Sequence, residues 1–89
     1  MFNLMDARYA ADVLGVVFDK FNIEEFLEGI NIELEHGLVN PYTNVTNNDL
    51  IITAKIALAH LNEFPNYYNK EYGLRKFENF LKNKLDNSQ

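Results

Sequence analysis

Two short histidine-containing steps are the part of this sequence whose residue types and spacing could support chemistry. Glu33 and His36 form an E-x-x-H step, and His60 and Glu63 form an H-x-x-E step. Residues three positions apart share one face of a helix, so two antiparallel helices carrying these steps could bring two carboxylates and two imidazoles together. Such groups bind zinc, iron and manganese, and helical bundles build metal centres from comparable steps. A divalent transition-metal site, conceivably that of a small metalloenzyme, is therefore one hypothesis.

The sequence offers no second catalytic arrangement. The only serine is Ser88, close to the end of the chain, and there is no cysteine. A serine nucleophile activated by histidine is therefore not expected, and without cysteine neither a disulfide framework nor a thiolate metal site is available. Because the chain also carries no known catalytic or cofactor motif, we expect a non-enzymatic protein without a cofactor unless the metal hypothesis holds.

A helical-wheel projection places one acidic residue and one histidine among apolar residues. On the helix expected over residues 23–36, Glu33 falls near the middle of a broad apolar arc that includes Ile30. On the helix expected over residues 49–63, His60 lies about 40° from the centre of the apolar arc. Both side chains are therefore predicted to be largely buried.

The burial of Glu33 and His60 suggests a structural alternative to the metal site. A buried carboxylate costs several kcal/mol unless it is paired, and a buried imidazole needs hydrogen-bond partners for its ring nitrogens. A hydrogen bond from His60 to Glu33, across the two helices, meets part of both needs. The sequence thus predicts a buried Glu33–His60 pair, and it leaves open whether the pair only stabilises the fold or also binds a metal.

Four helices are expected to carry these residues. Asn22 and Glu25 form a capping box before the second helix. Thr46 or Asn48 is expected to cap the third helix, which Pro65 ends. The predicted helices cover residues 6–14, 23–36, 49–63 and 66–84.

The fold class expected from these elements is all-α. A chain this short has room for one hydrophobic core only. We predict a small four-helix bundle-like domain over residues 1–89, with a central antiparallel helix pair at about residues 23–36 and 49–63. Residues 71–89 are expected to hold the C-terminal helix and a frayed tail.

Composition and charge exclude several classes of partner. Hydrophobic residues make up 47% of the 89 residues, which favours a folded domain. The net charge is −5, so binding to nucleic-acid phosphates is not expected. No segment approaches the ~18 apolar residues of a membrane span, and the N-terminal residues lack the features of a signal peptide. We therefore expect no membrane association and a cytoplasmic location.

The last predicted helix offers a candidate interaction surface. It carries an amphipathic stripe, and such stripes are usually part of the core. In so small a domain, however, a late helix that extends past the bundle could bury Tyr72, Phe80 and Leu85 on a partner. A protein partner or self-association is therefore expected.

Three sequence segments occur here in the order typical of one known family. They are ELEHG at residues 33–37, NVTNND at residues 44–49 and AHLNEFPNYY at residues 59–68. Over about residues 5–70, the chain resembles an uncharacterised family of small helical domains of unknown function, known from bacteria, phages and large DNA viruses. The resemblance implies the helical fold and the same site residues, and for a viral member it implies the host cytoplasm or the virion. It implies no activity, because the family has none established.

Two functions from different classes remain open at this point. The first is a non-enzymatic structural or protein-interaction module that contains the buried Glu33–His60 pair. The second is a metal-binding domain in which Glu33, His36, His60 and Glu63 hold zinc, iron or manganese.

Overall fold

The computed structural model describes residues 1–69 and 80–82, and all regular structure in that part of the chain is helical. The three main helices are α1 (Leu4–Leu14), α2 (Ile23–Val39) and α3 (Leu50–Glu63), and residues 80–82 are also helical. Each main helix packs against the other two, and the contact between α2 and α3 is the most extensive. The predicted all-α fold class and the central position of α2 and α3 are therefore confirmed.

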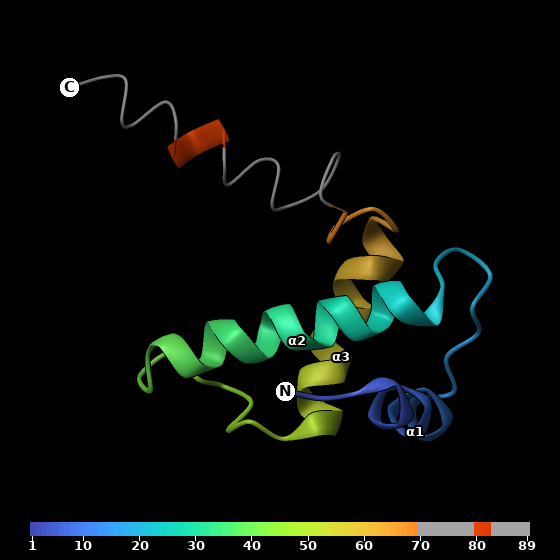
Figure 1. Cartoon of the computed structure of the whole chain (residues 1–89), viewed down its shortest axis with the longest axis horizontal. Coiled ribbons are helices and arrows are strands. Elements are labelled where there is room, and N and C mark those ends of the chain that lie inside the picture. The colour runs from blue at the N-terminus through green and yellow to red at the C-terminus, as the bar shows by residue number, and fades with distance from the viewer. Residues whose placement is uncertain (70–79, 83–89) are drawn as a thin grey trace.

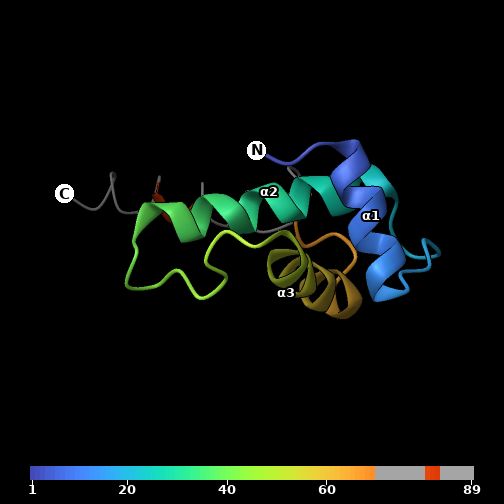
Figure 2. The same ribbon diagram turned by 90° about the horizontal axis from the view of Figure 1, so that it is seen from below.

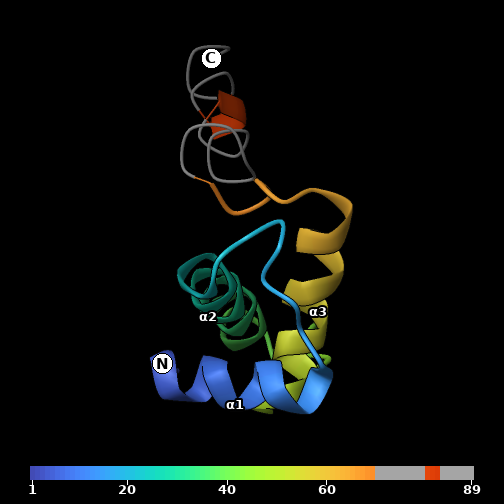
Figure 3. The ribbon, with the colours of Figure 1, turned by 90° about the vertical axis from the view of Figure 1, so that its right-hand side faces the viewer.

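The central helices cross one another, although an antiparallel pair was predicted. α2 runs along the length of Figure 1 and α3 passes across it, and Figure 3 shows α1 lying across the base of α3. A crossed arrangement lets α3 contact α1 as well as α2, and Ala7 and Ala10 of α1 are fully buried at this junction. Small side chains of this kind allow close approach of the helices.

The core lies where the three helices meet. Phe26 and Ile30 of α2, Leu61 of α3 and the fully buried alanines Ala54 and Ala57 form its centre. Burial of such apolar side chains is the main source of stability in a domain of this size. None of the helices within residues 1–69 and 80–82 combines the length and the hydropathy of a membrane-spanning segment.

α1 and α2 both begin with a capping box, in which two side chains and two backbone amides bond reciprocally. Asn22 and Glu25 form the predicted box of α2. Asn3 and Asp6 form a second box, which was not predicted. α1 therefore begins at Leu4 and not at the predicted residue 6.

α3 is capped by Asp49, and the prediction of Thr46 or Asn48 was wrong. The Asp49 carboxylate accepts a hydrogen bond of 2.9 Å from the Ile52 amide. Asn47 and Asn48 adopt positive φ angles of 52° and 63°, whereas an N-cap residue needs an extended backbone. Asn48 therefore belongs to the turn before the helix.

α2 continues past the glycine that was expected to end it. Gly37 remains helical and the helix extends to Val39. Its missing side chain makes room for the loop that follows, because a Cβ at Gly37 would lie only 2.8 Å from the Asn44 Oδ1 atom. The end of α2 and the loop of residues 40–48 project beyond α3 (Figures 1 and 2).

The N-terminal residues lie along α2, as Figure 2 shows. The Phe2 amide donates to Asn31 Oδ1 at 2.9 Å, and Asn31 Nδ2 donates to the Phe2 carbonyl at 3.1 Å. This reciprocal pair satisfies backbone groups that precede α1 and fixes the start of the chain on the central helix.

The segment after α3 forms turns at residues 65–68. The Tyr67 amide donates to the Phe64 carbonyl at 2.9 Å. The turns carry Tyr68 back toward α2 and α3, where only 2% of the residue is exposed.

The predicted fourth helix over residues 66–84 is therefore wrong at its start. Residues 80–82 are helical. The remainder of that helix and the predicted frayed tail fall on residues 70–79 and 83–89, which lie outside the described residues.

Candidate functional site

Glu33, Tyr68 and His60 form a chain of polar side chains that joins α2, α3 and the segment after α3. The Tyr68 hydroxyl donates a hydrogen bond of 3.0 Å to Glu33 Oε1. His60 Nδ1 lies 2.9 Å from the same hydroxyl and 3.3 Å from Glu33 Oε1. The structure thus brings the two predicted residues together and adds a tyrosine that bonds to both.

The hydrogen-bond directions fix the positions of the protons. A tyrosine hydroxyl carries a single proton. Because Tyr68 donates this proton to Glu33, its oxygen must accept a hydrogen bond from His60. His60 therefore carries a proton on Nδ1, which leaves Nε2 as an acceptor when the ring is neutral.

The two ends of this chain differ in burial. The Glu33 side chain is 10% exposed, close to what the helical wheel suggests, whereas the His60 side chain is 32% exposed and lies nearer the surface. Tyr67 stacks on the His60 ring, with centroids 4.3 Å apart and an interplanar angle of 18°. The imidazole is therefore held by stacking on one face and by hydrogen bonding at Nδ1.

Gly29 makes room for the Tyr68 ring on α2. A Cβ atom at Gly29 would lie 2.5 Å from Cε2 and 2.7 Å from Cδ2 of the ring. Glu33 follows Gly29 by four residues, so both face the same side of α2. A glycine one turn before the glutamate thus allows the tyrosine to reach the carboxylate.

The surroundings of Tyr68 raise the pKa of its hydroxyl well above the ordinary value. Burial is the largest cause, and the negative charge of Glu33 and the hydrogen bond donated to it act in the same direction. The hydroxyl therefore remains protonated, as its role as a donor to Glu33 requires.

Because of this raised pKa, the free energy of unfolding should depend on pH in the alkaline range. Below about pH 10, Tyr68 is protonated in both the folded and the unfolded chain. Above that pH the unfolded chain loses the proton while the folded chain keeps it, so the free energy of unfolding should fall by up to about 1.4 kcal/mol per pH unit from this group. Urea denaturation between pH 9.5 and 11 would measure the slope. The Tyr68→Phe variant is the control; an equal slope in this variant would contradict the assignment.

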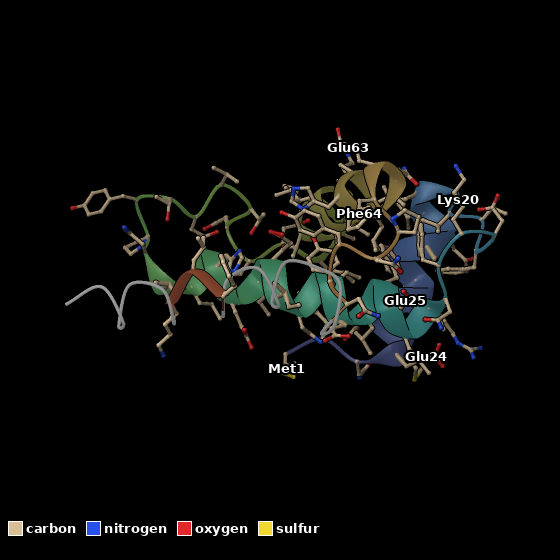
Figure 4. The ribbon with its side chains drawn as sticks, turned by 90° about the horizontal axis from the view of Figure 1, so that it is seen from above. Met1, Lys20, Glu24, Glu25, Glu63 and Phe64 are labelled. Atoms are coloured by element: carbon tan, nitrogen blue, oxygen red, sulfur yellow. The ribbon has the colours of Figure 1, made fainter. Side chains whose placement is uncertain are left out.

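The four predicted metal ligands do not converge. His36 Nδ1 lies 3.9 Å from Glu33 Oε2, the carboxylate oxygen to which Tyr68 does not donate. Glu63 is exposed and points outward from the end of α3 (Figure 4). Across the described ranges, no group of three or more histidine, aspartate or glutamate side chains is arranged to hold a metal ion.

A pocket of about 200 Å³ lies beside Glu33, between α2, α3 and the loop that joins them. α2 contributes Glu33, His36 and Gly37 to its wall, the loop contributes residues 43–46, and α3 contributes Ile56. The Glu33 carboxylate therefore contacts two sets of groups. One is the hydrogen-bonded pair of Tyr68 and His60, and the other is the lining of this pocket.

Asn44 holds the loop wall of the pocket in place. Its Oδ1 atom accepts hydrogen bonds from the Asn47 amide at 3.0 Å and from the Thr46 hydroxyl at 3.2 Å. Its Nδ2 atom donates to Asn48 Oδ1 at 2.9 Å. These bonds use most of the hydrogen-bonding capacity of the amide, so Asn44 shapes the pocket more than it offers free groups to a ligand.

Tyr68 and Asn44 are absent from the residues predicted for the site. A signal for Tyr68 does exist, because a buried carboxylate can accept several hydrogen bonds and one imidazole cannot supply them all. The turn residues around Asn44 gave no comparable signal, since their contact with Gly37 depends on the tertiary fold.

Comparison with known proteins yields one finding. A family model described as "Protein of unknown function (DUF5661)" matches residues 7–79, in agreement with the resemblance to an uncharacterised domain family. Neither the curated proteins nor the solved structures gave a match.

Proposed function

We propose that this chain, which belongs to the DUF5661 family of proteins of unknown function, is a non-enzymatic module that binds another protein. The binding surface consists of the apolar side chains at the end of α2 and in the following loop. This tip surface comprises Leu38, Val39, Tyr42 and Val45, which are between 59% and 97% exposed.

The observation that carries the proposal is the combination of these apolar side chains with the pocket beside Glu33. Val45 belongs to both, because it lines the pocket and is largely exposed. Contiguous exposed apolar groups that border polar groups are typical of protein-interaction sites. The tip also projects from the rest of the described chain (Figure 1), so a partner can reach it without contacting α1.

A second group of exposed apolar side chains lies on the outer face of α1. Met5, Tyr9 and Val13 are spaced four residues apart and are all exposed. None of these three α1 residues lines the pocket beside Glu33, because the lining residues all lie between Glu33 and Ile56 in sequence. We therefore favour the tip surface and use α1 as the control.

The Glu33–Tyr68–His60 chain has a structural part in this proposal. It links α2 to α3 and to the segment after α3, and so fixes the carboxylate that forms the pocket wall. In this role His60 takes part in no chemical reaction.

The surface predicted on the last helix remains a prediction. Phe80 is 57% exposed, whereas Tyr72 and Leu85 lie outside the described residues. A contact there would extend the binding surface and would not replace the tip.

Selection from a random peptide library tests the proposal. The purified chain should enrich peptides whose binding is at least tenfold weaker for a Val39→Ser, Tyr42→Ser variant, because two exposed apolar contacts are lost. The matched control, Tyr9→Ser with Val17→Ser, also removes one exposed tyrosine and one exposed valine, and should bind within twofold of the unaltered chain.

Two outcomes would contradict the proposal. The first is a library that yields no enriched peptide. The second is equal loss of binding in the tip variant and the control, or loss in the control alone, which would place the contact on another surface.

A further inference from the structure

We infer that the pocket beside Glu33 binds the ammonium group of a lysine side chain of the partner protein. The inference rests on the proposed function, and it names the chemistry that the tip surface would recognise.

The free oxygen of the Glu33 carboxylate is the first observation. Oε1 accepts the hydrogen bond from Tyr68 and lies 3.3 Å from His60 Nδ1. Among the described residues Oε2 accepts no hydrogen bond, and its ion-pair neighbour, His36 Nδ1, lies 3.9 Å away, which is too long for a hydrogen bond. The side chain is only 10% exposed and lines the pocket. A carboxylate oxygen of a mostly buried side chain thus has unused acceptor capacity at a pocket wall.

The charge around this carboxylate is the second observation. The groups that pair with Glu33 are the two histidines, and among the described residues neither a lysine nor an arginine lies within ion-pair distance of it. Residues 1–69 hold ten acidic and three basic residues, a formal charge of −7. A buried carboxylate gains stability from an opposite charge, and the net negative charge of residues 1–69 favours the approach of a cation.

The geometry favours lysine over arginine. A guanidinium group binds a carboxylate best through both oxygens at once, but Oε1 already bonds to Tyr68. An ammonium group acts as a compact point charge and needs only one carboxylate oxygen. The Thr43 hydroxyl also lines the pocket and donates to the Asn40 carbonyl, so its oxygen can accept a second bond from the ammonium group.

The size and remaining lining of the pocket suit the same side chain. A volume of about 200 Å³ accommodates one long side chain and little more. Val45 and Ile56 provide apolar contact for the methylene groups, since lysine side chains commonly bury their stems while the head binds a polar group. The exposed Val39 and Tyr42 lie in sequence between the pocket residues Gly37 and Thr43, and would contact residues next to that lysine.

Nuclear magnetic resonance titration at pH 8 tests the inference. The probe is Nα-acetyl-lysine N-methylamide, and its expected effect is a saturable shift of the amide signals of Gly37 and Asn44, which border the pocket. The same molecule acetylated on Nε, which removes the charge, should bind at least tenfold more weakly. The arginine counterpart should also bind more weakly than the lysine probe.

A pair of glutamine variants supplies the matched control. Glu33→Gln removes the charge but keeps an oxygen that can accept from Tyr68, and it should weaken binding of the lysine probe at least tenfold. Glu35→Gln makes the same change in net charge at an exposed position two residues away, and it should weaken binding less than twofold. Thermal unfolding of both variants checks that the fold is retained.

Three results would overturn the inference. They are equal binding of the acetylated probe, equal weakening by the two glutamine variants, or stabilisation by zinc or manganese where the lysine probe has no effect. If library peptides depend on the tip surface but contain no lysine, the inference fails and the proposed function stands. If the lysine probe binds but no peptide is enriched, the proposed function fails, and with it the assignment of the lysine to a partner protein.

Discussion

Replacement of Tyr68 by alanine should lower the free energy of unfolding by about 4 kcal/mol. The tyrosine is almost fully buried and its ring occupies the space above Gly29, so its loss removes buried apolar area and leaves a cavity against the α2 backbone. The variant also loses the hydroxyl that bonds to both Glu33 and His60. Urea denaturation followed by circular dichroism would measure the change.

Two controls separate the contributions to this loss. Tyr68→Phe keeps the ring and removes only the hydroxyl, so it should cost about 1 kcal/mol. Tyr42→Ala removes a tyrosine that is 97% exposed and should change stability by less than about 0.5 kcal/mol. If Tyr68→Ala cost no more than Tyr68→Phe, the ring would not be packed between the helices as the structure shows.

The parts of the fold that depend on neighbours in sequence could be predicted from it. The Asn22–Glu25 capping box and the end of α3 before Pro65 are set by local side chains. The placement of Glu33 on the core side of α2 follows from helical periodicity alone, since the apolar residues around it repeat every three or four positions.

The parts that depend on distant contacts could not be predicted in this way. Tyr68 lies 35 residues after Glu33, and the turns at residues 65–68 that bring it back are compatible with the start of a helix in sequence terms, because proline suits a first helical turn. Gly37 reads as a helix stop, but its role is to let Asn44 approach α2. In both cases a tertiary contact decided between two local conformations.

The position of the Glu33 carboxylate, between the Tyr68–His60 pair and the pocket, connects the fold to the proposed function. Hydrogen bonding at Oε1 holds the carboxylate in one orientation, and Oε2 then lies beside His36, which lines the pocket with Glu33. A carboxylate held in this way loses little side-chain freedom when a ligand binds, which favours recognition of a single cationic group. Weakening of the Tyr68 contact should therefore affect binding as well as stability.

Gly29→Ala should have opposite effects on stability in two backgrounds. In the unaltered chain the new methyl group would lie 2.5 Å from Cε2 of the buried Tyr68 ring. Overpacking of this kind costs about 1–3 kcal/mol, and the higher helix propensity of alanine returns up to about 1 kcal/mol. With the full return, the net loss is up to about 2 kcal/mol.

In the Tyr68→Ala background the Tyr68 ring is absent, so it no longer clashes with the new methyl group at position 29. Only the gain in helix propensity remains, so Gly29→Ala should there stabilise the chain by up to about 1 kcal/mol. The double-mutant cycle, measured by urea denaturation of the four proteins, isolates the coupling between the two positions. A Gly29→Ala effect of the same sign and size in both backgrounds would show that Tyr68 does not rest on Gly29. A reversal of sign would establish that the glycine at this position serves the tyrosine, and through it the orientation of Glu33.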